Sequence, residues 1–243
     1  MKKFSIITIC LNEPRLERTC ESIVNQTCQD FEWIVIDGGS EQKTLDVFEK
    51  YTYRMDYFAS EKNHGMYDAM NKGIARASGA WVNFMHAGDC FSHVDILGRV
   101  KEELTIYNNF DVLYGILKYD GVGPFRSHAF VYDEQITREF WLNKTTPHRS
   151  AFYKRALFKK YGNYDISFKV FSYYDYNIKL FFDGCLFKHL EYVIACRDNT
   201  GESFVCVLNH EERMCILHKY YSKTEISANM RKKFQELRAR VTS

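Results

Sequence analysis

The sequence lacks any C-x-x-C pair among its eight cysteines, and this absence argues against a structural zinc site. Several of the cysteines stand among apolar residues, where a thiol packs as a small hydrophobic side chain. A chain of 243 residues can bury a core of its own, so its stability does not require a disulfide scaffold. We therefore expect reduced thiols.

The sequence also lacks a long apolar run and a strong charge of either sign. The first apolar stretch, residues 4–7, is too short for a signal peptide, and no window approaches the length of a membrane span. A formal net charge of +2 gives no support for nucleic acid as a partner. These absences predict a cytoplasmic protein that does not bind nucleic acid.

No internal repeat, low-complexity tract or linker interrupts the chain, and its first half alternates strand-like with helix-like patterns. The strand-like runs are residues 4–10, 31–36, 55–59 and 80–85, and the helical patterns are residues 15–27, 41–51 and 66–77. This alternation predicts an α/β fold with a Rossmann-like, mainly parallel sheet flanked by helices. Ligands of such sheets bind beyond the carboxyl ends of the strands, where Asn12, Asp37, Glu61 and Asp89 stand.

The second half is less regular. Residues 111–117 and 125–132 flank a turn-like segment and predict a hairpin. Short helices are expected at residues 156–160 and 174–182, with a strand at residues 186–196. From His210 onward the pattern predicts two helices, which form a C-terminal helical extension.

Two carboxylates at the predicted strand ends each allow two interpretations. Asp89 leaves a buried strand through a small-residue loop and suits a divalent cation that neutralises a diphosphate, but it also suits the cap of the following helix. Asp37 precedes two glycines and can accept hydrogen bonds from a nucleotide base or ribose. Taken alone, Asp37 is better explained as a turn aspartate.

The segment Ser60–Gly73 carries the most information. Asp68 and Lys72 share one face of the predicted helix and can form an ion pair. The helix begins at Gly65, directly beyond a strand, so its N-terminus is suited to bind an anion.

Four ordered motifs resemble those of family 2 glycosyltransferases with the GT-A fold. They are Ser5–Thr8 with Asn12-Glu13, Ile34–Ser40, Ser60–Gly73 and Gly79–Asp89. The resemblance covers roughly the first 100 residues well and residues 148–180 less closely. It implies a domain over residues 1–208, with a nucleotide-sugar-binding half (1–110) and an acceptor-side half (111–208), followed by the extension at 209–243.

The resemblance also implies roles for single residues on the donor side. Asp37 would contact a uridine-type base or ribose, Thr8 and Asn12 would lie beside the nucleotide, and Asp68 and Lys72 would lie near the donor. Asp89 would be the principal ligand of Mn²⁺ or Mg²⁺. One departure from the family pattern concerns the acidic D-x-D cluster, because His86 and Gly88 stand where carboxylates often occur. The metal would then be held weakly, or chiefly through the donor phosphates.

On the acceptor side, Tyr174-Asp175-Tyr176 resembles the segment that supplies the general base of the family. Asp175 would remove the acceptor proton, although Tyr174 stands where an acidic residue is common. The alternative for Asp175 is an ordinary carboxylate in the first turn of a helix. His148 either contacts the acceptor or a donor phosphate, or packs beside Pro147.

The function implied by the resemblance is inverting transfer of a sugar from a nucleotide-diphosphate sugar, of UDP type, to a hydroxyl of a saccharide or lipid-linked saccharide in bacterial surface polysaccharide synthesis. The basic C-terminal helix either contacts the inner face of the membrane or presents a solvated face. A catalytically inactive sugar-nucleotide-binding protein remains an alternative. A nucleotidyltransferase or a redox enzyme fits less well, because no glycine-rich phosphate loop follows the first strand.

Overall fold

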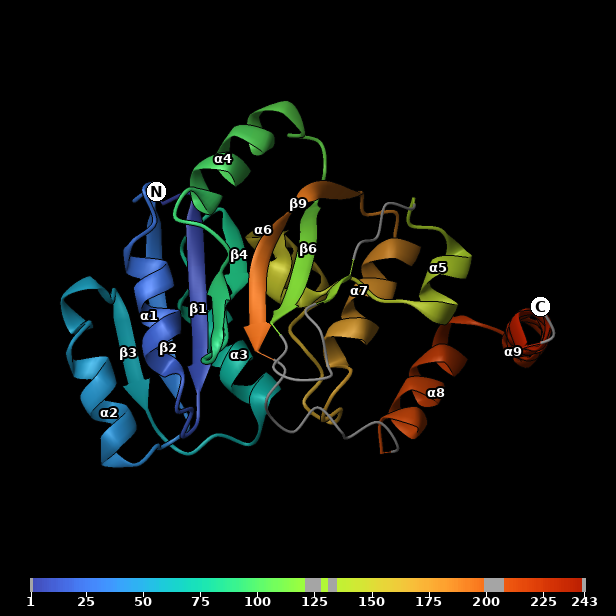
Figure 1. Cartoon of the computed structure of the whole chain (residues 1–243), viewed down its shortest axis with the longest axis horizontal. Coiled ribbons are helices and arrows are strands. Elements are labelled where there is room, and N and C mark those ends of the chain that lie inside the picture. Colours follow the sequence, from blue (N-terminus) through green and yellow to red (C-terminus); the bar gives the residue numbers. More distant parts are fainter. Residues whose placement is uncertain (1, 121–127, 131–134, 199–207, 242–243) are drawn as a thin grey trace.

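The computed structural model describes residues 2–120, 128–130, 135–198 and 208–241 (Figure 1). The strands are β1 (Phe4–Cys10), β2 (Phe31–Asp37), β3 (Tyr57–Ser60), β4 (Trp81–Phe84), β5 (Asp89–Phe91), β6 (Val112–Asp120), β7 (His128–Phe130), β8 (Ala151–Lys154) and β9 (Phe187–Asp198). The α-helices are α1 (Leu16–Val24), α2 (Gln42–Glu49), α3 (Met66–Arg76), α4 (Ile96–Ile106), α5 (Arg138–Asn143), α6 (Arg155–Tyr161), α7 (Ser172–Phe182), α8 (Leu208–Tyr220) and α9 (Lys223–Val241). Two 3₁₀ turns, η1 (Thr52–Arg54) and η2 (His148–Ser150), complete the described elements.

The strands form one mixed sheet in the order β3-β2-β1-β4-β8-β6-β9-β5, with β7 paired to β6. The first four strands run parallel, and Cys10 pairs with Asp37, which pairs with Ser60. The carboxyl ends of β1, β2 and β3 therefore meet at one edge. The predicted Rossmann-like α/β fold is confirmed, and the parallel part of the sheet is the part that the sequence predicted.

Helices cover both faces of the sheet because the central strands are buried on both sides. In β1, Phe4 and Ile6 pack with α1, α2 and α4, whereas Ile7 packs with α3, α6 and α7. All seven residues of β2 are buried, which explains its nearly continuous apolar pattern. The result is a three-layer body whose polar loops lie at the strand ends.

Gly79, just before β4, lies directly against the start of β1. Its N–H donates to the hydroxyl of Ser5 at 2.9 Å and to the carboxylate of Glu32 at 2.9 Å. A Cβ atom at this position would lie 2.6 Å from the carbonyl carbon of Phe4. Only glycine allows this contact between two backbones.

Several predictions for the irregular parts change in the structure. Asp89 was expected in a loop but begins β5, which pairs antiparallel with β9. Residues 140–152, which carried no clear pattern, contain most of α5, η2 and the start of β8. The predicted hairpin is β6 paired with β7, and its turn at residues 121–127 lies outside the described residues.

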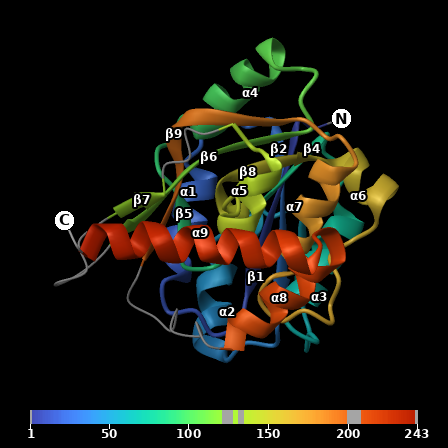
Figure 2. The ribbon, with the colours of Figure 1, turned by 90° about the vertical axis from the view of Figure 1, so that its right-hand side faces the viewer.

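The two predicted C-terminal helices are present as α8 and α9. Ile216 and Leu217 of α8 are buried with Trp141, Tyr174 and other side chains of α5 and α7. Figure 2 shows α9 crossing the side of the molecule, where it packs against α5. None of the helices in the described ranges combines the length and apolar character needed to cross a membrane, and the seven cysteines in those ranges are free thiols.

Candidate functional site

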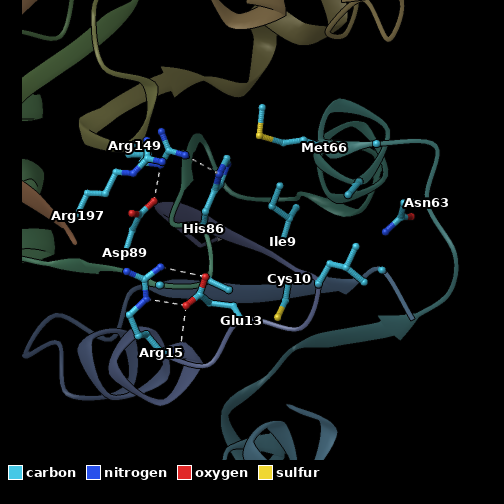
Figure 3. A pocket seen from close by; sticks show the side chains of 16 residues that line it. Ile9, Cys10, Glu13, Arg15, Asn63, Met66, His86, Asp89, Arg149 and Arg197 are labelled. Carbon is cyan, nitrogen blue, oxygen red and sulfur yellow. Dashed lines mark hydrogen bonds and ion pairs between the residues drawn. The ribbon is translucent and has the colours of Figure 1, made fainter. Parts of the chain in front are cut away.

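A cavity of about 350 Å³ opens at the carboxyl ends of the parallel strands (Figure 3). It lies between the end of β1, the N-terminus of α3, and the loop that joins β4 to β5. It is lined by Ile9, Cys10, Leu11, Glu13, Arg15, Gly38, Asn63, Gly65, Met66, Ala69, His86, Ala87, Gly88, Asp89, Arg149 and Arg197. This is the sheet edge at which the sequence predicted a site, and the start of α3 lines it as expected for an anion-binding helix terminus.

Asp89 binds arginine inside this cavity. Its carboxylate forms an ion pair with the Nε group of Arg149, which comes from η2. Asp89 also pairs in register with Arg197 across β5 and β9, so a second guanidinium lies beside the same carboxylate (Figure 3). Only 6% of the Asp89 side chain and 16% of the Arg149 side chain are exposed, so these charges interact with little screening by water.

The pKa values of the two arginines shift in opposite directions. Burial acts to lower the pKa of Arg149, but the carboxylate of Asp89, together with Tyr119 and Tyr173, raises it overall. Burial and the positive charge of Arg149 together lower the pKa of Arg197. A second ion pair, Arg15 with Glu13 at 2.7 Å, lies on the same wall. The lining residues thus hold three arginines against two carboxylates, an excess of one positive charge that favours an anionic ligand.

Two buried histidines stand next to this cluster. The ring of His86 lies 5.1 Å from that of His148, and Nδ1 of His86 lies 3.5 Å from Nη2 of Arg149. Burial, and then the charge of Arg149, lower the pKa of both histidines well below the usual range, so both imidazoles are neutral. Their Nε2 atoms have no hydrogen-bond partner among the described residues. His86 lines the cavity and can offer its ring to a ligand, whereas His148 lies behind it.

The predicted nucleotide residues lie around the cavity but outside its described lining. The carboxylate of Asp37 is buried and accepts hydrogen bonds from Gly39, Ser40 and Ser60, as a turn aspartate does. Thr8 accepts a hydrogen bond from the indole of Trp33 at 3.0 Å. A nucleotide role for Asp37 and Thr8 stays a prediction.

Asn12 adopts a left-handed backbone with φ of 52°, a conformation that asparagine tolerates better than most residues. Its side-chain oxygen accepts a hydrogen bond from the N–H of Glu41 at 2.7 Å, and its own N–H donates to Ser40 at 2.8 Å. Asn12 therefore holds the loop after β1 against the loop after β2, and contact with a nucleotide remains a prediction.

The expected ion pair between Asp68 and Lys72 is present at 3.4 Å. Lys72 also pairs with Glu61 at 2.8 Å and donates to Asn63 at 2.7 Å. Asn63 lines the cavity, so this group forms part of its rim. The N–H of His64 donates to Asp68 at 2.9 Å, which fixes the entry into α3.

The residues predicted to act on the acceptor side lie away from the lining of this cavity. Asp175 stands in the first turn of α7 as expected, but its carboxylate binds Nζ of Lys219 at 3.1 Å and the hydroxyl of Tyr220 at 3.2 Å, both from α8. Tyr174 is buried and donates its hydroxyl to the carbonyl of Trp141. Neither residue is part of the described lining of the cavity. The residue of α7 beside the histidines is Tyr173, whose ring lies 4.5 Å from that of His148.

Arg149 and Arg197 line the cavity but were not predicted from the sequence as site residues. Arg149 follows His148 in a segment that was assigned to the acceptor side, and its position next to His148 was the one available signal. Arg197 reaches the cavity because β9 pairs with β5, a pairing that the local sequence pattern does not indicate. The sheet topology, and not the local sequence, brings Arg149 and Arg197 close to Asp89.

The site does not fit a resident divalent cation. The described residues contain no group of three or more His, Cys, Asp or Glu side chains that could hold one. Asp89, the predicted ligand, is already paired with Arg149 and adjacent to Arg197. A cation at Asp89 would have to stand beside two fixed positive charges.

Comparison with known proteins identifies relatives among bacterial enzymes. The chain is 30% identical over 200 residues to a PGL/p-HBAD biosynthesis glycosyltransferase of Mycobacterium bovis, a match that covers 81% of this chain and 76% of the relative. It is 33% identical over 176 residues to an uncharacterized glycosyltransferase of Mycobacterium tuberculosis, over 68% of this chain and 64% of the relative.

Solved structures share the fold. The S. aureus TarS 1–349 structure in complex with UDP-GlcNAc superposes with a TM-score of 0.69 at 17% identity, covering 93% of this chain and 70% of that chain. Another structure of TarS 1–349 is matched over 60% of its length. A mannosyltransferase from Pyrobaculum calidifontis, in complex with GDP-Man and Mn²⁺, gives a TM-score of 0.62 at 15% identity, over 83% of this chain and 58% of that chain.

These likenesses agree with the GT-A fold implied by the sequence motifs. The family model described as glycosyl transferase family 2 matches residues 5–162, which include nearly all of β1, the strands β2–β4, Asp89 at the start of β5, and Arg149. The chain belongs to glycosyl transferase family 2.

Proposed function

We propose that the protein transfers a sugar from a nucleotide-diphosphate sugar, of UDP type, to an acceptor hydroxyl. The observation that carries this proposal is the positively charged cavity at the strand ends of a family 2 fold. A diphosphate supplies the negative charge that the cavity lacks, and the start of α3 presents backbone N–H groups to it. The S. aureus structure holds UDP-GlcNAc, which is a donor of this class.

The reaction proposed is one in-line displacement with inversion. The acceptor oxygen forms a bond to the anomeric carbon while the bond from that carbon to the diphosphate oxygen breaks, and the electron pair leaves with the diphosphate. The acceptor proton passes to a base, for which the resemblance indicates Asp175. The cavity binds and orients the leaving group, and its buried walls exclude water from the reacting atoms.

Donor binding and turnover test the proposal. We expect UDP-sugars to raise the melting temperature of the purified chain, because a ligand that binds only the folded state stabilises it. Incubation with the bound UDP-sugar should release UDP slowly through hydrolysis and faster with an acceptor. UMP serves as the control, since it lacks the second phosphate. Binding without transfer or hydrolysis would instead identify an inactive sugar-nucleotide-binding protein.

The role of Asp175 needs a test that separates proton transfer from packing against α8. Asp175→Asn keeps the size of the side chain and can still bind Tyr220. If Asp175 is the base, we expect kcat/KM to fall by about 10²–10⁴-fold with an unchanged melting temperature. Tyr220→Phe is the matched control, because it removes the hydrogen bond between α8 and Asp175 and leaves the carboxylate. Wild-type rates in Asp175→Asn would restrict Asp175 to a structural role.

For the acceptor we propose a saccharide or lipid-linked saccharide of bacterial surface polysaccharide synthesis, reached at the inner face of the membrane. The support is α9, on which Met230 and Phe234 are 55% and 68% exposed beside the exposed side chains of Arg231 and Lys233. Such a helix face suits an anionic lipid surface. Cosedimentation with phosphatidylglycerol vesicles, and its absence with phosphatidylcholine vesicles, tests this contact.

A further inference from the structure

We propose that Arg149 and Arg197 neutralise the diphosphate of the donor in place of a divalent cation. This inference rests on the proposed function and assigns the chemistry of the same cavity. It differs from the expectation that Asp89 holds Mn²⁺ or Mg²⁺. In this arrangement Asp89 is a positioning residue that holds the guanidinium group of Arg149 in place, beside Arg197, until the donor arrives.

The balance of charge at the base of the cavity supports the proposal. Arg149 forms an ion pair with Asp89, Arg197 stands opposite Asp89 in the register of β5 and β9, and Arg15 pairs with Glu13. The described lining of the cavity thus carries three arginines and two carboxylates, an excess of one positive charge. A dication would add to this excess. A diphosphate group, which carries at least two negative charges, would remove it.

The geometry supplies the donors that a diphosphate needs. Arg149 comes from η2 and Arg197 from β9, so both are held by backbone that belongs to the sheet or packs against it. A guanidinium group presents five N–H donors in a planar fork, which matches phosphate oxygens bidentately. Figure 3 shows both side chains and His86 gathered on one wall, facing the side of the cavity formed by Met66 and Asn63.

The departure of the diphosphate also requires positive charge in the cavity. As the bond between the anomeric carbon and the phosphate oxygen breaks, negative charge grows on the diphosphate. Preorganised positive groups in a site shielded from water stabilise such charge without further reorganisation. Two guanidinium groups supply the positive charge that a bound cation would otherwise provide.

Calorimetry with UDP and UMP tests the inference, because the two ligands differ by one phosphate. We expect UDP to bind at least about tenfold more tightly than UMP in EDTA, as one or two charge-assisted hydrogen bonds allow. Replacing EDTA with MnCl₂ should change the UDP affinity less than threefold. Binding of UDP in MnCl₂ but not in EDTA would overturn the inference and leave the proposed function intact. Failure of UDP and UDP-sugars to bind in both buffers would instead overturn the proposed function.

Two variants give opposite results for the two modes of neutralisation. Arg197→Gln should reduce the preference for UDP over UMP about tenfold and leave the UMP affinity unchanged. Asp89→Asn should keep or tighten UDP binding in EDTA, because it removes the carboxylate that competes with the diphosphate for Arg149, whereas a cation ligand at this position would make the same variant lose UDP. The matched control is Arg18→Gln, which breaks a pair with Asp120 outside the cavity lining and should leave the preference unchanged. If Asp89→Asn does not fold, UDP binding by wild type in EDTA and by Arg197→Gln still tests the inference. An unchanged preference for UDP over UMP in folded Arg197→Gln contradicts it.

Discussion

Replacing Asp89 with alanine is expected to lower the free energy of unfolding by about 3–5 kcal/mol, because it leaves Arg149, whose side chain is only 16% exposed, without its carboxylate. The loss exceeds that of a surface ion pair, since the Asp89 side chain is 6% exposed. Urea unfolding followed by circular dichroism measures it. The same variant should gain more stability from added UDP than wild type does, because the ligand then supplies the missing negative charge.

Two controls separate this electrostatic effect from lost packing. Asp120→Ala breaks the pair with Arg18, in which about a third of each side chain is exposed, and should cost about 0–1 kcal/mol. The double variant Asp89→Ala with Arg149→Met removes one charge of each sign and should recover part of the loss. Equal destabilisation in the single and double variants would show that buried charge is not the cause.

The second large effect is expected at Gly79. Gly79→Ala should lower the free energy of unfolding by about 3 kcal/mol or more, because overpacking against an immobile neighbour is at the costly end of its range. The new Cβ atom would lie 2.6 Å from the carbonyl carbon of Phe4 and 2.7 Å from the nitrogen of Ser5. Both atoms belong to the backbone of β1, the central strand, and cannot move without disturbing the sheet. Thermal and urea unfolding provide the measurement.

Gly98 offers a matched substitution with the opposite sign. It lies inside α4, and the nearest atom to a new Cβ would be the Cβ of Cys28 at 3.9 Å. Gly98→Ala should therefore stabilise the protein by about 0.5–1 kcal/mol through helix propensity. If Gly79→Ala proves as mild as Gly98→Ala, the close contact between Gly79 and β1 is not present in solution.

The parallel half of the sheet was predictable because its signals are local. Buried strands such as residues 4–10 are continuous apolar runs, and each is followed by a helix with a period of 3.6 residues. The edge of the sheet at which the cavity lies also followed from the sequence, because ligands of such sheets bind beyond the carboxyl ends of the parallel strands. The same rule placed Asp89 at this edge, and both Asp89 and Gly65, at the start of α3, line the cavity.

The rest of the site depends on contacts between distant segments, which leave no local pattern. Arg197 reaches Asp89 only through the pairing of β5 with β9, and β5, with three residues, is too short to show a period. Asp175 illustrates a second limit. The helix that carries it was predicted, but its facing toward Lys219 and Tyr220 depends on where α8 docks. A helical period indicates which side chains share a face and does not indicate what that face meets.

The docking of α8 determines where the chain can be truncated without exposing its apolar interior. Ile216 and Leu217 fill the space above Trp141, Tyr174 and Ile178, so α5, α7 and α8 share one apolar cluster. A protein cut before residue 208 would present these aromatic rings to water, and such a patch favours aggregation. The first of the C-terminal helices therefore completes the apolar cluster that α5 and α7 begin, and a minimal folding unit must include it.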